Sequence, residues 1–443
     1  MKFYSTNSPS VKVDFKEAVF NSFPPDKGLY MPEEIPVLTK NFIENIEKYT
    51  FGEIAFEVAR SLLRGSIPED DLQTIIEDAF DFPAPVVKLD DQINVLELFH
   101  GPSLAFKDFG ARFMSRIMSY YLEKDDKMLD VLVATSGDTG GAVALGFLDV
   151  PGTRVTILYP EGKVSDIQEK QLTTNGHNIR AIAVKGNFDD CQALVKKAFT
   201  NTELNNALRL TSANSINIAR LIPQTFYYFN AYAALKREGR SAFVFSVPSG
   251  NFGNIAAGIL AWKMGLPVKQ FLAATNANDT VPVFLNTGDF KPKASVQTFS
   301  NAMDVGDPSN WTRIMELFDG NADLLKQLIT AYSYTDEQTI EAMKAIGKRY
   351  NYVACPHTSI AWMALEDWFK ENPGDQSAGI FLSTAHPCKF PEVIPQQLIS
   401  MLAIPEQVSG LKNRKAEFDL IEPDFEVFKT LLLADKAIDL PKI

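Results

Sequence analysis

The feature of this 443-residue sequence that most limits its fold is a regular alternation of short apolar runs and helical patterns. From residue 129 onward, the runs LDVLVAT, RVTILYP and IRAIAVKG are separated by helix-like stretches such as SDIQEKQLTT and DDCQALVKKAF. A second series contains AFVFSV, the helix-like IAAGILAWKMG and KQFLAAT, and it resumes with NYVACPH and AGIFLSTAHP. Strands that alternate with helices are typical of βαβ units around a parallel sheet.

Two such series predict an α/β fold with two Rossmann-like lobes, each built on a parallel sheet, and a ligand site between them. Residues 1–95 contain proline-rich connectors and indicate an additional N-terminal subdomain. We therefore expect this subdomain at residues 1–95, one lobe at 96–225 and the second lobe at 226–443. Within the second lobe, residues 311–348 are predicted to be helical throughout.

The charge of the chain argues against two classes of partner. Lysine and arginine number 43 against 55 aspartate and glutamate residues, which gives a formal net charge of −12. Nucleic acids and anionic membranes attract basic surfaces, so neither is expected to bind. No apolar run approaches the roughly 20 residues of a membrane-spanning helix, and the first residues lack the apolar core of a signal peptide. These observations predict a cytoplasmic protein.

Cysteine and histidine are too sparse and too scattered to suggest a metal site. The three cysteines form no CxxC pair, and the four histidines form no HExxH motif. The cysteine spacing also does not resemble a disulfide framework. We expect neither a bound metal nor a stabilising disulfide.

The stretch SVPSGNFGN places a glycine-rich turn between a predicted strand and a predicted helix. Glycine lets the backbone approach an anion closely, and the free N–H groups at a helix start favour phosphate. The residues from Ser249 to Asn254 are therefore a candidate phosphate cradle. The alternative is an ordinary strand-to-helix turn, because isolated glycine patterns are weak evidence.

The stretch ATSGDTGGA has the same strand–turn–helix context but no lysine of a Walker loop. It offers the hydroxyls of Thr135, Ser136 and Thr139 and the carboxylate of Asp138. Such a density of polar groups at a helix start suits a substrate with carboxylate or phosphate groups. A loop whose side chains only cap the helix is the alternative.

A single lysine, Lys107, lies in HGPSLAFKDFGARFM, directly before a pattern of apolar residues spaced four apart. That spacing predicts a helix with a broad buried face. Burial and the positive end of the helix dipole both lower the pKa of an amine at this position, which makes it a better nucleophile. The alternative is a lysine that pairs with Asp108 while its stem covers Phe106.

Together, a nucleophilic lysine, a phosphate cradle and a second anion-binding loop are the parts that a pyridoxal phosphate enzyme needs. In this order, the sequence also contains SANSINIARLIPQ, SNAMDVGDPSNWTR, PHTSIAW and LSTAHPCKF. With the three stretches above, these motifs resemble the ordered set of the threonine synthase family over nearly the full length. The resemblance implies pyridoxal phosphate fold type II, like tryptophan synthase β.

The resemblance implies that Lys107 forms the Schiff base with pyridoxal 5'-phosphate and later moves protons at the substrate carbons. Phe106 would line the ring pocket, Asp138 would contact the ring hydroxyl, and Thr384 would lie beside the pyridine nitrogen. The cofactor phosphate would be held by Ser249, Gly250, Asn251, Phe252, Gly253 and Asn254.

The substrate that the resemblance implies is O-phosphohomoserine, which carries a carboxylate and a phosphate. Ser136 and its neighbours suit the carboxylate. The phosphate is expected at Asn214, Ser215 and Arg220, with Thr135 and Thr139 as partners. We assign no catalytic role to His357 or His386, because loop histidines beside proline are more often hydrogen-bonded structural residues.

The implied reaction is γ-elimination of phosphate followed by addition of water at the β carbon, which yields threonine. A monomer or a homodimer is expected from the fold type. Three alternatives stay open: a phospholyase, a serine or threonine dehydratase of the same fold type, and a catalytically inactive relative that senses ligands. Dehydratases would not need the NSINIAR stretch, and a sensor would not need Lys107.

Overall fold

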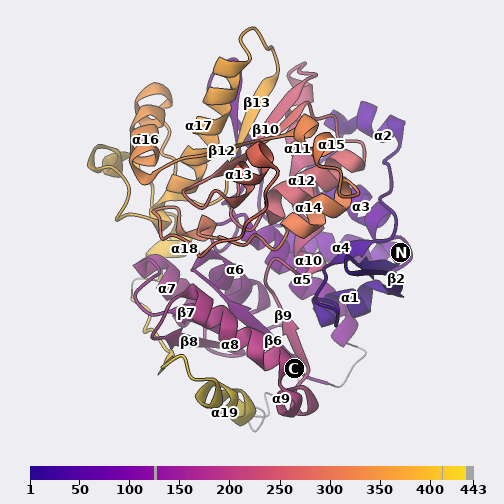
Figure 1. Ribbon diagram of the computed structural model, residues 1–443, viewed down its shortest axis with the longest axis vertical. Helices are drawn as coiled ribbons and strands as arrows, with labels where there is room; N and C mark the ends of the chain where they lie inside the picture. Colours follow the sequence, from indigo (N-terminus) through magenta and orange to yellow (C-terminus); the bar gives the residue numbers. More distant parts are fainter. Residues whose placement is uncertain (124–126, 412, 436–443) are drawn as a thin grey trace.

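The computed structural model describes residues 1–123, 127–411 and 413–435, and it contains two large sheets, one in each lobe (Figure 1). The upper sheet in Figure 1 has six strands and is parallel except for β4 at its edge. Its strands, in spatial order, are β12 (Ile329–Ser333), β11 (Gln270–Thr275), β10 (Phe243–Pro248), β13 (Ala378–Ser383), β5 (Ile93–Glu97) and β4 (Val86–Lys88).

The lower sheet has five strands, all parallel. In spatial order they are β14 (Asp419–Ile421), β8 (Ile179–Val184), β7 (Thr153–Pro160), β6 (Leu129–Ala134) and β9 (Leu210–Ser212). Every residue of β6 is buried, as expected for a central parallel strand that helices cover on both faces. The two-lobed α/β architecture predicted from the sequence is confirmed.

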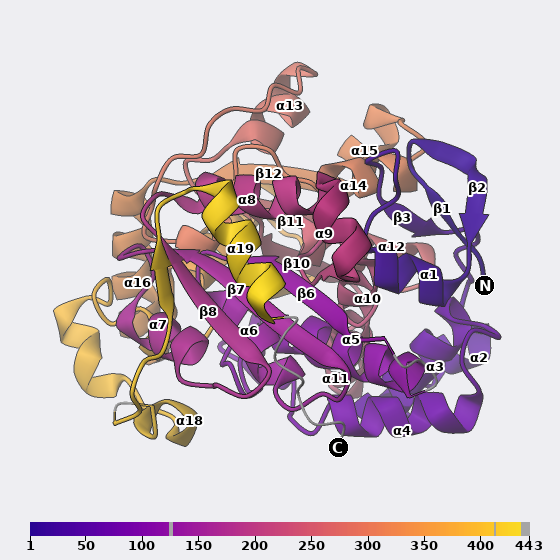
Figure 2. The ribbon, with the colours of Figure 1, turned by 90° about the horizontal axis from the view of Figure 1, so that it is seen from below.

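Helices cover both sheets, and those of the five-stranded sheet include α8 and α19, which lie side by side in Figure 2. The helices packed around this sheet are α6 (Asp138–Phe147), α7 (Asp166–Thr173), α8 (Phe188–Thr200), α9 (Thr202–Ala207) and α19 (Phe425–Asp435). The helices around the six-stranded sheet are α11 (Gln224–Arg237), α12 (Gly253–Lys263), α13 (Thr280–Thr287), α14 (Trp311–Leu317), α15 (Ala322–Leu328), α16 (Asp336–Tyr350) and α17 (Pro356–Glu371).

Two helices join the lobes: α5 (Lys107–Leu122) packs against α6 and also against α10 (Ile218–Leu221). The buried face of α5 carries aromatic and aliphatic side chains at the predicted spacing. The remaining short elements of this part are η2 (Asn301–Met303), η3 (Pro387–Lys389), η4 (Gln396–Met401) and α18 (Glu406–Ser409).

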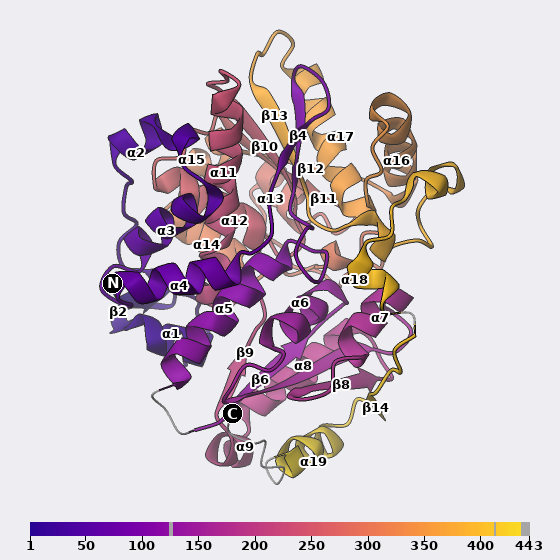
Figure 3. The same cartoon turned by 180° about the vertical axis from the view of Figure 1, so that it is seen from behind.

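The N-terminal residues form a small antiparallel sheet and a group of helices beside both lobes (Figure 3). Helix α3 packs against α11 and α4 packs against α5, so this subdomain supports the helix that begins at Lys107. Its elements are β1 (Phe3–Ser5), β2 (Ser8–Val13), α1 (Phe15–Asn21), β3 (Tyr30–Pro32), α2 (Lys40–Glu44), η1 (Ile46–Lys48), α3 (Phe51–Leu62) and α4 (Glu69–Ala79).

Two strand pairings cross the boundaries that the sequence suggested. Strand β5 pairs with β13, although it precedes the first lobe in the sequence, and β14 returns from the C-terminal region to pair with β8. The limits at residues 95 and 225 stay a prediction as boundaries of folding units.

Two details of the secondary-structure prediction are wrong. Residues 329–333 form strand β12 instead of helix, because this segment pairs with β11 at the sheet edge. The stretch NYVACPH forms no strand: residues 352–355 are irregular and α17 begins at Pro356. Proline is favoured at the first position of a helix, where its missing N–H would have no partner in any case, so α17 can begin at this residue. No helix among the described residues is long and apolar enough to cross a membrane.

Candidate active site

The predicted site residues all follow the carboxyl ends of parallel strands. In the six-stranded sheet, β10, β13 and β5 are neighbours and lead to the SGNFGN loop, to Thr384 and to the Lys107 segment. In the five-stranded sheet, β6 and β9 are neighbours and lead to the ATSGDTGGA loop and to Asn214. Carboxyl ends of parallel strands share one edge, where ligands bind in open α/β sheets.

The Lys107 segment is hydrogen-bonded to the chain that follows β13. The Phe106 N–H donates to Thr384 O at 2.8 Å, and the His386 N–H donates to Leu104 O at 3.0 Å. Leu104 has a φ of +59°, a backbone conformation uncommon for a branched residue. These contacts fix the start of α5 beside Thr384; the roles of Lys107 and Thr384 toward the cofactor stay a prediction.

The Lys107 amine has no hydrogen-bond or ion-pair partner in the part of the chain that the structure describes. Its Nζ lies 5.8 Å from the centre of the Phe106 ring. Burial lowers the pKa of Lys107 to about 8, and the cations Lys389 and Arg220 add to this effect against the attraction of Asp138. The predicted lowering of the pKa is therefore present in the structure.

The alternative in which Lys107 pairs with Asp108 is wrong. No ion pair joins Asp108 to Lys107 among the described residues, and the Asp108 Oδ2 accepts a hydrogen bond from the Ser103 N–H at 2.9 Å. Burial raises the pKa of Asp108 to about 6. A methyl group built on Gly101 would lie 2.5 Å from this Oδ2, so the glycine makes room for the carboxylate.

Asp138 forms a buried ion pair with Lys389 that joins the two lobes. Its Oδ1 lies 2.7 Å from Lys389 Nζ and accepts from Gln168 Nε2 at 3.0 Å. Lys389 is wholly buried and also donates to Ser103 O at 2.9 Å. Burial alone would raise the pKa of Asp138, but the attraction of Lys389 and then Lys107 holds it well below its usual range.

Lys389 and Gln168 were not predicted as site residues. Lys389 lies in the LSTAHPCKF stretch, where a lysine among apolar residues was the available signal. Gln168 lies at the third position of α7, where it completes a capping box with Ser165. Nothing in its local sequence indicates the contact with Asp138.

The SGNFGN loop has the features of a phosphate cradle. Helix α12 begins at Gly253, so the N–H groups of its first turn have no partner within the helix. Phe252 before it has a left-handed φ of +59°. The Asn254 Oδ1 accepts from the hydroxyls of Tyr227 and Tyr228, whereas its buried Nδ2 has no partner. Free donors at a helix start fit the phosphate of pyridoxal phosphate.

In the ATSGDTGGA loop, the Thr135 hydroxyl shapes the turn. Its Oγ1 accepts from the N–H groups of Gly137 at 3.0 Å and Gly140 at 2.8 Å, which leaves the hydroxyl proton free to donate. Ser136 and Thr139 are half-buried on the same loop. The structure thus brings the three predicted hydroxyls to one turn.

The NSINIAR stretch lies between the two anion loops. The Asn214 side chain donates to Ala134 O at 2.8 Å, and Ser215 Oγ accepts from Asn251 Nδ2 at 2.7 Å. Arg220 is buried, its Nε has no partner, and burial lowers its pKa to about 10 against the attraction of Asp108.

The two histidines make structural hydrogen bonds. His357 Nε2 accepts from the Ala302 N–H at 3.2 Å, and His386 Nδ1 accepts from the Cys388 N–H at 3.2 Å. Burial lowers the pKa of each imidazole to about 4, so both are neutral at pH 7. Among the described residues, no group of three or more histidine, cysteine, aspartate or glutamate side chains could hold a metal ion.

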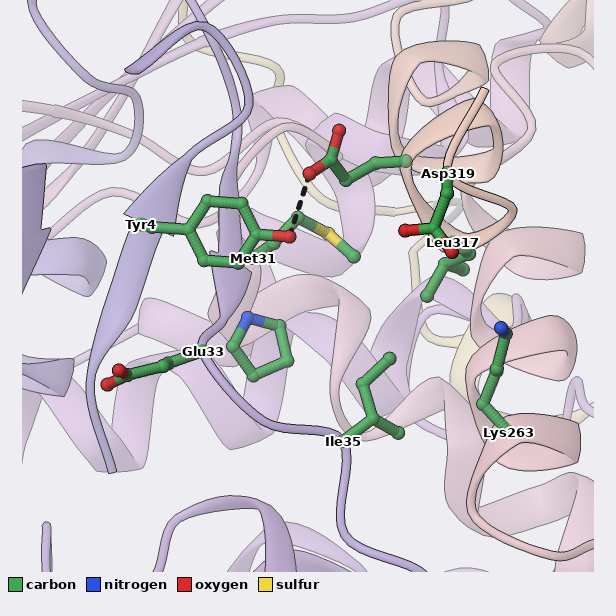
Figure 4. Close-up of a pocket in the computed structure, with 9 residues that line it drawn as sticks. Tyr4, Met31, Glu33, Ile35, Lys263, Leu317 and Asp319 are labelled. Atoms are coloured by element: carbon green, nitrogen blue, oxygen red, sulfur yellow. Dashed lines mark hydrogen bonds between the residues drawn. The ribbon is translucent and has the colours of Figure 1, made fainter. Parts of the chain in front are cut away.

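A separate cavity of about 270 Å³ lies between the N-terminal strands and helices α12 and α14 (Figure 4). The Tyr4 hydroxyl donates to Glu316 Oε1 at 2.8 Å, and Lys263 and Asp319 lie on the other side. None of the predicted site residues lines this cavity. It is therefore distinct from the region around Lys107.

Comparison with known proteins shows the family to which the chain belongs. The model of the family "Pyridoxal-phosphate dependent enzyme" matches residues 82–382, and those of the threonine synthase N terminus and C-terminal part match residues 2–80 and 358–432. The chain is 43% identical to threonine synthase of Escherichia coli over 98% of its length and 99% of the relative. The chain belongs to the threonine synthase family. Threonine synthase of Haemophilus influenzae is 44% identical over 98% of this chain and all of that relative.

Solved threonine synthases have the same fold. The crystal structure from E. coli matches with a TM-score of 0.90 and 42% identity, covering 98% of this chain and 100% of that one. The pyridoxal-phosphate-bound structure from Brucella melitensis matches with a TM-score of 0.91 and 32% identity, covering 99% and 100%. The predicted fold type and the predicted cofactor, pyridoxal phosphate, are confirmed by membership of this family.

Proposed function

We propose that the chain converts O-phospho-L-homoserine and water to L-threonine and phosphate, the last step of threonine biosynthesis. The observation that carries the proposal is the environment of Lys107: its buried amine has no hydrogen-bond or ion-pair partner among the described residues, and burial together with the charges of Asp138, Lys389 and Arg220 sets its lowered pKa. Membership of the threonine synthase family supports the same reaction.

We assign the cofactor to the six-stranded lobe. When bound, pyridoxal phosphate supplies an aldehyde that combines with an amine and a ring that withdraws electrons from the substrate's α carbon. Lys107 would hold it covalently, and the cradle from Ser249 to Asn254 would hold its phosphate. Phe106 and Thr384 flank the lysine and would contact the ring. Thr384 offers a neutral hydroxyl, so the ring nitrogen is not forced to stay protonated, as it would be beside a carboxylate.

For Asp138 we propose a role in addition to the contact with the ring hydroxyl that the resemblance implies. Its Oδ1 is occupied by Lys389 and Gln168, so we propose that it acts on the site mainly as a fixed negative charge near Lys107. That charge partly offsets the cations that lower the pKa of the lysine. A contact with the ring hydroxyl would have to use the other carboxylate oxygen.

We assign the substrate to the loops of the five-stranded lobe. Ser136 and its neighbours would bind the carboxylate, and Asn214, Ser215 and Arg220 would bind the phosphate, with Thr135 and Thr139 beside them. The Lys107 amine would take the α proton of the substrate and return protons later in the reaction. One lysine that moves several protons is consistent with the structural role of both histidines.

We also propose that the chain works in the cytoplasm as a monomer or a homodimer. All three cysteines are free and buried, as is usual in a reducing compartment. The site named here is assembled from one chain and needs no residue of a second copy.

The test is an assay in which phosphate and threonine are measured separately after O-phosphohomoserine is added to the holoprotein. Equal amounts of both, lost in Lys107→Ala, would support the synthase. Phosphate with 2-oxobutyrate and ammonia in place of threonine would instead indicate a phospholyase. A protein that takes up pyridoxal phosphate without any turnover of this substrate would contradict the proposal and favour a dehydratase or a ligand sensor.

A further inference from the structure

Arg313 in α14 is wholly buried, and no carboxylate among the described residues pairs with it. Its five N–H groups are directed at neutral oxygens. They donate to Tyr30 O at 3.2 and 3.3 Å, to Ser215 O at 3.2 Å, to Ile216 O at 2.6 Å and to Asn310 Oδ1 at 2.7 Å. Burial lowers the pKa of this guanidinium to about 9. A buried cation is costly unless an opposite charge or a full set of hydrogen bonds compensates it.

The contact with Arg313 fixes the orientation of the Asn310 amide. A guanidinium can only donate, so the amide atom facing it must be the oxygen. The amide nitrogen of Asn310 is then directed at Ser215 Oγ, 3.3 Å away, and at Asn251 O, 3.1 Å away.

A second amide reaches the same hydroxyl with an orientation that is also fixed. The Ser309 backbone N–H donates to Asn251 Oδ1 at 2.6 Å, so the other side of this amide is its NH₂ group. Asn251 Nδ2 donates to Ser215 Oγ at 2.7 Å. Asn251 belongs to the SGNFGN loop, so this contact also joins the phosphate cradle to the NSINIAR stretch.

Ser215 Oγ therefore accepts from two amides. A hydroxyl has one proton and two lone pairs, so both lone pairs are occupied and the group can act further only as a donor. Its proton has no acceptor within residues 1–123, 127–411 and 413–435, and the side chain is half-buried. A ligand bound here must supply an acceptor, and phosphate oxygens are strong acceptors.

We propose that Arg313 and Asn310 are positioning residues for phosphate: through the series Arg313, Asn310 and Ser215 they make the serine hydroxyl an obligatory donor to a phosphate oxygen. The charge of Arg313, which is hydrogen-bonded to neutral oxygens but paired with no carboxylate among the described residues, attracts the same dianion. The inference rests on the proposed function, which places the substrate phosphate at Asn214, Ser215 and Arg220. Because Asn251 is part of the cofactor cradle, the phosphate could belong either to the substrate or to pyridoxal phosphate.

The sharpest test is Asn310→Asp, a change with almost no difference in shape. An aspartate keeps the contact with Arg313, now as an ion pair, but it presents an acceptor to Ser215. The serine proton then turns to Asp in place of the ligand, and the added charge repels phosphate. Ser215→Ala removes the same donor without adding a charge, and therefore separates the two effects.

The measurement is titration of the holoprotein with inorganic phosphate by calorimetry, with pyridoxal phosphate affinity and melting temperature measured on the same variants. Hydrogen bonds to charged groups predict a loss of phosphate affinity of roughly 10- to 100-fold in both variants. The KM for O-phosphohomoserine should rise by a similar factor, with a smaller change in kcat. Arg313→Lys, which cannot make all the contacts, should also bind phosphate more weakly, whereas the exposed control Arg349→Lys should match the wild type.

Weaker binding of inorganic phosphate with unchanged cofactor affinity would support the proposal and assign the hydroxyl to the substrate phosphate. Weaker cofactor binding alone would support it and assign the hydroxyl to the cofactor phosphate. Wild-type affinity for both in Asn310→Asp and Ser215→Ala would overturn it, as would a fall in melting temperature with no selective loss. If the wild-type holoprotein binds phosphate but makes no threonine, the proposed function is wrong. The phosphate affinities of Asn310→Asp and Ser215→Ala then still decide whether this inference is correct.

Discussion

Lys389 and Arg313 are both wholly buried cations near the candidate site, but the protein compensates their charges in opposite ways. Lys389 has a carboxylate partner, Asp138, at 2.7 Å across the junction of the lobes. Arg313 has four neutral oxygens as partners: three backbone carbonyl oxygens, from two segments of the chain, and the side-chain oxygen of Asn310. One charge is balanced inside the protein, and the other is available to balance a charge that arrives with a ligand.

The difference suggests two separate uses of a buried cation in this protein. A balanced pair beside Lys107 gives a local field that is present with or without ligand. Arg313, at the proposed phosphate region, has hydrogen bonds but no opposite charge among the described residues, so binding of an anion there should stabilise the protein. Variants that break the Lys389–Asp138 pair should therefore lower the stability of the protein, whereas variants around Arg313 should mainly weaken the binding of phosphate.

The largest effect should come from a change of Lys107, whose amine has neither an ion-pair partner nor a hydrogen-bond partner among the described residues. Lys107→Ala should lower threonine formation by at least about 10³-fold, because the other buried amine of the site, that of Lys389, is held in an ion pair with Asp138. The exposed Lys370→Ala is the matched control and should keep full activity. Threonine formation by Lys107→Ala at a tenth of the wild-type rate would mean that another residue performs the proton transfers.

Lys389→Met should leave Asp138 buried without a partner and lower the free energy of unfolding by about 3–5 kcal/mol. The double variant Asp138→Asn/Lys389→Met should recover much of this loss, since it leaves no unpaired charge. Denaturant unfolding of the single and double variants measures the interaction free energy between Asp138 and Lys389. A double variant no more stable than Lys389→Met would show that the pair is not balanced in the way described here.

Inorganic phosphate should stabilise the holoprotein, because it supplies the missing counter-charge near Arg313. A ligand at 100 times its dissociation constant adds about 2.7 kcal/mol to the free energy of unfolding. Potassium chloride at the same ionic strength is the control and should have little effect. If both salts raise the melting temperature equally, the stabilisation is general screening and not a phosphate site.

The smallest effect should appear in the pH dependence of cofactor uptake. With a pKa of about 8 for Lys107, the amine is protonated and unreactive below pH 8, so the rate of cofactor binding to the apoprotein should rise about tenfold per pH unit up to that value. In Lys389→Met the midpoint should move to higher pH, because a neighbouring cation is lost and Asp138 is left unpaired. Stopped-flow absorbance measures both curves, and a midpoint that moves to lower pH would contradict the assigned charges.

The alternation of strands and helices could be predicted from the sequence because the spacing of apolar residues differs between a buried strand and a helix. The strand β6, the glycine-rich turn after it and helix α6 follow the pattern of LDVLVATSGDTGG. Strand β12 was missed because its five residues are compatible with a helix, and only pairing with β11 makes them a strand. Likewise, nothing in the local sequence indicates that β14 pairs with β8.

For the site, the sequence by itself determined which residues have the right chemistry: a lysine at a helix start, two glycine-rich turns and a stretch with asparagine, serine and arginine. Only the tertiary structure decided that Asp138 pairs with Lys389 and that the Asn310 amide meets the Ser215 hydroxyl. These contacts join residues 95 or more positions apart. Hydrogen-bond direction and charge balance depend on which groups meet in space, whereas periodicity and turn chemistry depend only on neighbours in the chain.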